Sequence, residues 1–90
     1  MSDVLHSHVL VLNKGYAPIR TTTVRDAFVK LFSAVAEAVS IEDGAYISHD
    51  FGSWAEISSL RIELGELPPE SDIIQTPRLS LIVPRVIRLL

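Results

Sequence analysis

VLVLNKGYAPIRTTTVRDAFVKLFS, residues 9–33, runs from an apolar strand through a polar turn into an amphipathic helix, and this stretch decides the fold. Its first four residues, 9–12, are a continuous apolar run of branched side chains, which predicts a strand buried on both faces. Residues 13–15, Asn-Lys-Gly, end this strand because Asn and Gly tolerate the positive φ of a chain reversal. Pro18 disfavours helical backbone at the residue before it, so we expect residues 16–20 to be an extended crossing segment.

The helix that begins after Thr23 has the clearest local signal in the chain. Thr23 is a good N-cap, and Asp26 at the third helical position completes an arrangement like a capping box. Asp26 also forms an i,i+4 pair with Lys30. Apolar residues recur at helical spacing and form one face: Val24, Ala27, Phe28, Leu31 and Phe32. We expect this face to lie on the strand, and the helix to end near Ala34.

Composition places the chain among folded proteins and excludes several classes. Its 90 residues are 48% hydrophobic, which predicts one domain, residues 1–90, with its own core. No apolar run approaches the ~18 residues of a membrane span, and the first residues lack a signal-peptide layout, so we expect no membrane partner and a cytoplasmic protein. With no cysteine, disulfides and thiolate metal sites are excluded. The net charge of −3 argues against a self-sufficient nucleic-acid binder.

The histidines are the residues that most suggest chemistry. His6 and His8 are spaced like metal ligands, but no third ligand lies nearby in sequence. We therefore expect both to be solvated, or to begin the first strand, within a flexible segment at residues 1–8. His49 beside Asp50 suggests acid–base work, but neighbours along a chain usually point apart, and no nucleophile stands near. We predict no catalytic residue, no metal, no cofactor and no small-molecule substrate.

Two further elements follow the first helix. Residues 36–41 and 45–48 are apolar runs joined through Asp43-Gly44, which predicts a β-hairpin. Ser53 and Glu56 form a second capping box, which predicts a short helix to about residue 60. Its inward residues are expected to be Trp54, Ile57 and Leu60. The whole of residues 49–72 is interpreted as an insertion-like loop that contains this short helix.

The tail, residues 73–90, is broken into short extended pieces by Pro77 and Pro84. Three of the eight basic residues of the chain lie in it: Arg78, Arg85 and Arg88. Clustered arginines on an extended segment contact phosphates, so these are our candidate nucleic-acid residues. The alternative, which we favour, is that these arginines lie on the solvated faces of strands.

The last residues of the tail are apolar and suggest self-association. They are Val86, Ile87, Leu89 and Leu90. A terminal strand of this kind either enters the sheet of its own domain or pairs with the same strand of a second copy about a two-fold axis. We favour the second arrangement, a homodimer.

Several of these segments together resemble the N-terminal region of bacterial HNH endonuclease family proteins. In that family an opening "VLVLN-x-x-Y-x-P-(L/I)" leads to a helix, then to "G-K-A-E-V-(V/I)" and "(L/V)-P-x-V-(I/V)-R-L". The matching positions are residues 9–13, Tyr16, Pro18, Ile19, Ala36, Glu37, Val39, Pro84, Val86, Ile87, Arg88 and Leu89. Residues 49–72 look like an insertion. Ala34-Val35 replaces the usual Gly-Lys, which suggests a helix that runs on further.

What the resemblance implies is a prefix domain without the nuclease chemistry. The family's metal finger, with its His general base, divalent cation and Cys-x-x-Cys pairs, lies downstream of the "VIRL" segment and has no counterpart in residues 1–90. The implied function is a non-catalytic accessory domain that helps to place nucleic acid or holds the nuclease module. The alternative is a protein-interaction or self-association module that uses exposed strand edges. DNA, if bound, is bound weakly.

These observations predict an α+β domain. We expect a small mixed or antiparallel sheet packed on one main amphipathic helix, residues 24–33, with a second short helix near Trp54.

Overall fold

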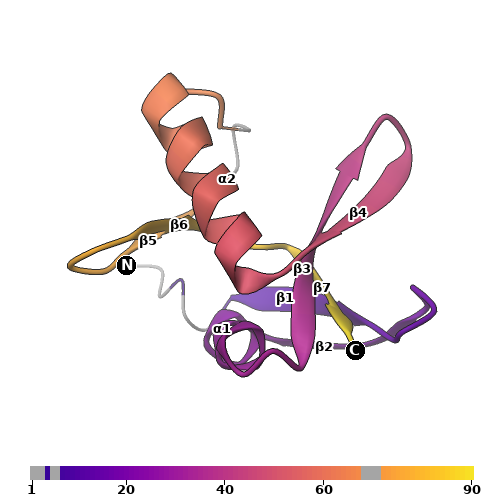
Figure 1. Ribbon diagram of the computed structural model, residues 1–90. Coiled ribbons are helices and arrows are strands. Elements are labelled where there is room, and N and C mark those ends of the chain that lie inside the picture. The colour runs from indigo at the N-terminus through magenta and orange to yellow at the C-terminus, as the bar shows by residue number, and fades with distance from the viewer. Residues whose placement is uncertain (1–3, 5–6, 68–71) are drawn as a thin grey trace.

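A mixed β-sheet carries both helices of the described chain on one face, and a small hairpin sheet lies beside it (Figure 1). The computed structural model describes residues 4, 7–67 and 72–90. The strands are β1 (His8–Leu12), β2 (Pro18–Thr23), β3 (Ala36–Glu42), β4 (Ala45–His49), β5 (Ile73–Gln75), β6 (Ser80–Ile82) and β7 (Val86–Leu89), and the helices are α1 (Val24–Phe32) and α2 (Phe51–Leu64). The predicted α+β class with a mixed sheet is confirmed.

The last strand, β7, lies in the middle of the large sheet. The five strands run in the order β2-β1-β7-β3-β4, with β7 parallel to β1 and antiparallel to β3. Both hydrogen-bonding edges of β7 are therefore occupied within the chain. The symmetric pairing of two β7 strands that we favoured from the sequence is wrong for this reason, and the alternative, a strand inside its own sheet, is what the structure shows.

The segment after β1 pairs with it as a full strand instead of crossing over the fold. Strand β2 runs antiparallel to β1, with a register shift where Val11 faces Arg20 and Leu12 faces Pro18. Pro18 opens an edge strand, a position where its missing N–H does no harm. On the second face of β1, Leu12 is buried but Leu10 remains 37% exposed, so the prediction of burial on both faces is wrong at Leu10.

Helix α1 begins and ends as its caps dictate. The Thr23 hydroxyl accepts a hydrogen bond from the Asp26 N–H at 3.1 Å, which confirms the predicted N-cap. At the other end the N–H of Ala34 bonds the carbonyl of Leu31, and the N–H of Val35 bonds that of Lys30. This is a Schellman turn, and it places Ala34 in the left-handed region at φ 58°. The helix therefore does not run on past the position where the family pattern has glycine.

The inner face of α1 is narrower than its apolar pattern suggested. Val24, Ala27 and Leu31 are buried against the sheet, with core residues of β1, β3 and β7 beneath them. Phe28 is half-buried, while Phe32 is 67% exposed. The prediction that Phe32 belongs to the core face is thus wrong.

Helix α2 is the longer of the two, so the prediction of a short second helix is corrected. Its N-cap is Asp50, whose carboxylate accepts from the Ser53 N–H at 2.8 Å, and not Ser53 itself. It ends at Gly65, which takes the left-handed φ of 69°. Trp54 is buried as predicted, whereas Leu60 is 56% exposed. Neither helix of the described part is long and apolar enough to cross a membrane.

The remaining predictions about segments have mixed outcomes. The β3–β4 hairpin is confirmed, with Asp43 and Gly44 both at positive φ in its turn. Much of the predicted loop at 49–72 is α2, because Asp50 starts a helix there. The interior of the remaining loop, residues 68–71, lies outside the described residues, as do residues 1–3 and 5–6 of the predicted flexible start.

Candidate protein-interaction surface

Arg88, one of the three candidate nucleic-acid residues, is held by neighbours within the chain. Its Nε donates to the Lys14 carbonyl oxygen at 2.8 Å, and its guanidinium lies 4.6 Å from the centre of the Tyr16 ring. One terminal nitrogen is 3.6 Å from a Glu37 carboxylate oxygen, and the Arg88 side chain is only 18% exposed. These contacts fix the turn after β1 over the sheet.

Tyr16 extends this arrangement across the sheet to β4. Its hydroxyl lies 2.9 Å from the Ser48 hydroxyl, and its ring is parallel to that of Tyr46, with centroids 5.7 Å apart. Tyr16 has a φ of 69°, a strained value for a residue with a Cβ. Tyr16, Glu37 and Arg88 all stand at positions of the family pattern, so that pattern was the one signal able to connect them. Spacing along the chain gave no indication that they meet.

The other two candidate arginines lie elsewhere. Arg85 precedes β7, and its guanidinium is 2.6 Å from the Asp72 carboxylate. Arg78 is exposed at the tip of the β5–β6 hairpin. Two of the three candidates thus have a carboxylate partner inside the chain, and phosphate contact by any of them stays a prediction.

The histidines that suggested chemistry are separated in the structure. His8 is exposed at the start of β1, and His6 lies outside the described residues. The Nε2 of His49 is 3.0 Å from the Ser40 hydroxyl, and its ring lies 5.8 Å from that of Trp54. Within residues 4, 7–67 and 72–90, no group of three or more acidic, histidine or cysteine side chains is arranged to hold a metal ion.

The candidate self-association residues divide between core and surface. Ile87 is fully buried, and Val86 and Leu89 are half-buried. Leu90 is 55% exposed, and its N–H donates to the Val35 carbonyl oxygen at 3.0 Å. Association through β7 is therefore unavailable, and a homodimer through another surface stays a prediction.

Apolar side chains gather on the surface where β7 ends. We call this the carboxyl-end surface, and its residues are Val29, Phe32, Val35, Phe51 and Leu90. Val29, Phe32 and Val35 are 57%, 67% and 50% exposed. The rings of Phe32 and Phe51 lie 4.1 Å apart, and the Schellman turn holds Val35 beside the last turn of α1. Exposed apolar residues that lie close together are typical of interaction sites, so this surface is the candidate.

Comparison with known proteins gives the chain a family. No curated protein and no solved structure matches it. A family model described as "HNH endonuclease-associated, N-terminal domain" matches residues 9–90, which is all but the first eight residues. That description names a domain associated with the nuclease, and not the nuclease module. The chain therefore belongs to the family of HNH endonuclease-associated N-terminal domains.

Proposed function

We propose that the chain is a non-catalytic accessory domain that holds the nuclease module of an HNH-endonuclease-like protein through the carboxyl-end surface. The family description supports this reading, because it names an N-terminal domain associated with an HNH endonuclease. The Leu90 N–H donates a hydrogen bond to the Val35 carbonyl oxygen. A nuclease module joined after the matched residues would therefore start beside the exposed apolar residues.

The observation that carries the proposal is the exposure of Phe32. It is 67% exposed although it lies on the apolar side of α1, and its ring lies against that of Phe51. Large aromatic side chains in such positions are typical anchors of protein–protein interfaces. A module that covers Phe32 and Val35 removes apolar area from water, which stabilises the joined arrangement by about 25 cal/mol per Å².

The electrostatics favour a protein partner over direct binding of nucleic acid. Four basic side chains of the described residues form ion pairs with acidic partners: Lys30, Arg61, Arg85 and Arg88. The net charge of the chain is −3. Affinity for nucleic acid rises with the number of phosphates that basic residues neutralise. The domain therefore helps to place nucleic acid by positioning the module that binds it.

The proposal is tested with this chain and a separately produced HNH module from a protein of the same family. Calorimetry should detect binding, and Phe32→Ser should weaken it at least tenfold, because it removes the anchor from an exposed site. Leu60→Ser is the matched control, because Leu60 is equally apolar, 56% exposed and lies on α2. Equal affinity of wild type and Phe32→Ser, or no binding at all, would overturn the proposal.

A second test concerns catalysis. With no His, Asp and Glu grouping for a metal among the described residues, the isolated chain should not nick plasmid DNA with any divalent cation. Nicking that persists through independent purifications and disappears in His49→Ala would show that the chain is itself an enzyme.

A further inference from the structure

Helix α2 lies along the outer edge of β6 and supplies hydrogen bonds there that a neighbouring strand would otherwise make. The Trp54 Nε1 donates to the Ile82 carbonyl oxygen at 2.8 Å. The Ile82 N–H donates to the Ser58 hydroxyl at 3.0 Å, and Ser58 is fully buried. Trp54 and Ser58 are one helical turn apart, so a single stripe of α2 satisfies both main-chain groups of Ile82.

The same edge continues to Ser80, where the helix has no such group to offer. In an antiparallel pair, main-chain groups point alternately to the partner strand and away from it. Bonds from Thr76 to Leu79 and from Val83 to Asp72 fix this alternation for β5 and β6. Ser80 therefore directs its N–H and C=O to the same side as Ile82. The next residue of the α2 stripe is Ile62, which has no hydrogen-bonding side chain.

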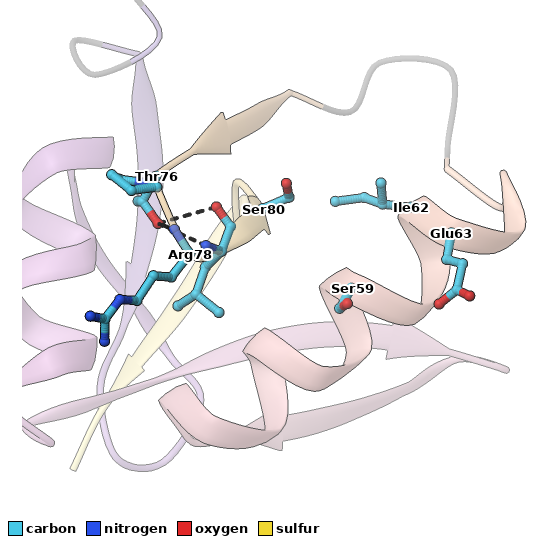
Figure 2. Close-up of a pocket in the computed structure, with 8 residues that line it drawn as sticks. Ser59, Ile62, Glu63, Thr76, Arg78 and Ser80 are labelled. Carbon is cyan, nitrogen blue, oxygen red and sulfur yellow. Dashed lines mark hydrogen bonds between the residues drawn. The ribbon is translucent and has the colours of Figure 1, made fainter.

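A groove lies at this point between α2 and the hairpin (Figure 2). It has a volume of about 400 Å³. Its lining comes from Ser59, Ile62 and Glu63 on α2 and from residues 76–80 on the hairpin. Figure 2 shows the guanidinium group of Arg78 directed away from Ser59 and Glu63. The helix side of the groove thus presents one carboxylate, one hydroxyl and an aliphatic side chain.

We propose that this groove binds an extended, positively charged peptide segment of a protein partner, which adds to the edge of β6 at Ser80. An exposed strand edge is a template for another extended chain, and strand addition is a recurrent mode of peptide recognition. The peptide donates an N–H to the Ser80 carbonyl and accepts from the Ser80 N–H. Its apolar side chains lie on Ile62 and Leu79.

The chemistry of the groove selects this occupant. A helical partner has its main-chain groups already bonded and offers none to Ser80. Arg78 also lines the groove, but its guanidinium is directed away from the helix side (Figure 2), where Glu63 supplies the charge. The carboxylate of Glu63 repels a phosphate and forms an ion pair with a lysine or arginine side chain. The edge offers the main-chain groups of one residue, so the complex is weak and reversible.

The test uses the whole chain and the peptide acetyl-Val-Lys-Val-Lys-Val-amide as probe, followed by amide NMR. Saturating peptide should shift the Ser80 amide and slow its hydrogen exchange, while the Ile82 amide, already bonded to Ser58, changes little. Glu63→Gln should weaken binding by about twofold to fivefold. Glu66→Gln is the matched control, because Glu66 is exposed just past the end of α2 and does not line the groove.

A second probe separates strand addition from simple charge attraction. The same peptide with every backbone nitrogen methylated keeps both lysines, but it has no backbone N–H for the Ser80 carbonyl, and its methyl groups keep its backbone from approaching the strand edge closely enough to accept from the Ser80 N–H. It should therefore leave the Ser80 exchange rate unchanged. Equal protection by both peptides, no response of Ser80 to millimolar unmethylated peptide, or an equal effect of the two Glu substitutions would each overturn the proposal.

Discussion

The two helices hold their strands by different means. Helix α1 packs aliphatic side chains against the five-stranded sheet, and its buried residues are Val24, Ala27 and Leu31. Helix α2 instead reaches the edge of β6 with side-chain hydrogen bonds, and its buried residues are Trp54 and Ser58. The first kind of contact appears in a sequence as an apolar stripe. The second does not, because Ser58 counts as polar in any search for apolar periodicity.

The largest expected effect tests the aliphatic contact of α1. Leu31 is 1% exposed and packs with Ala38, Trp54 and Ile82. Leu31→Ala should lower the free energy of unfolding by about 2–5 kcal/mol, because the lost transfer energy is joined by a cavity. Urea denaturation measures this loss. Val29→Ala is the control, because at 57% exposure it should change stability by less than about 0.5 kcal/mol.

The next effect tests the polar contact of α2. Ser58→Ala removes the acceptor of the buried Ile82 N–H and should cost about 1–3 kcal/mol, although alanine is the better helix former. Ser59→Ala, one residue along and exposed, should be neutral or slightly stabilising. If the two variants unfold at the same urea concentration, the hydrogen bond to Ile82 does not hold β6 to the helix.

A smaller pair of effects compares how the helices end. Both use a left-handed residue, Ala34 at φ 58° after α1 and Gly65 at φ 69° after α2. Ala34→Gly should stabilise the protein by about 1 kcal/mol, because it relieves the Cβ strain. Gly65→Ala should destabilise it by a similar amount, since a Cβ there meets no atom within 4 Å and only the backbone conformation opposes it. Thermal melts of the two variants should move in opposite directions.

The smallest effect concerns pH and the start of α1. A hydrogen bond from Thr22 at 2.6 Å, followed by the nearby Lys30, lowers the pKa of Asp26 below its ordinary 3.8, against an opposing contribution from burial. Because the pKa is lower in the folded state, the ionised carboxylate stabilises the fold above the unfolded value, and this contribution disappears as the pH falls through the folded value.

Wild type should therefore lose more stability than Asp26→Asn between about pH 6 and about pH 3. Urea midpoints at several pH values measure the difference. Glu56→Gln on the exposed side of α2 is the control and should follow wild type. Parallel curves for wild type and Asp26→Asn would show that the Asp26 carboxylate does not stabilise the fold.

What the sequence predicted well are the elements with local signals. The cap at Thr23 and the Asp43-Gly44 turn each lie within a few residues of the structure they specify, and both are confirmed. The predicted start of α2 was wrong although its signal is also local. Asp50 and Ser53 are both good N-cap residues, and the structure uses Asp50. The predicted inward face of α2 followed Trp54 at intervals of three residues, to Ile57 and Leu60. The buried residue is instead Ser58, four residues after Trp54.

Local sequence signals could not predict which distant segments come together. Arg88 donates to the Lys14 carbonyl oxygen across 74 positions of the chain, and no pattern in either segment indicates this contact. Of the carboxyl-end surface, the sequence assigned Phe32 to the core face and Leu90 to self-association, and it gave Val29, Val35 and Phe51 no role, because an apolar residue in a sequence does not state whether it is covered. Phe32 shows this most clearly, since it fits the helical period of α1 and is nevertheless 67% exposed.

The central place of β7 also orders events during synthesis. The β1–β2 and β3–β4 hairpins form from neighbouring residues, but β7 alone joins them into one sheet. Two-stranded hairpins are marginal in water by themselves. Until residues 86–89 leave the ribosome, the nascent chain has two unjoined hairpins and exposed apolar faces. Any chain that follows is thus being translated while this domain closes, so the folding of the two is coupled in time.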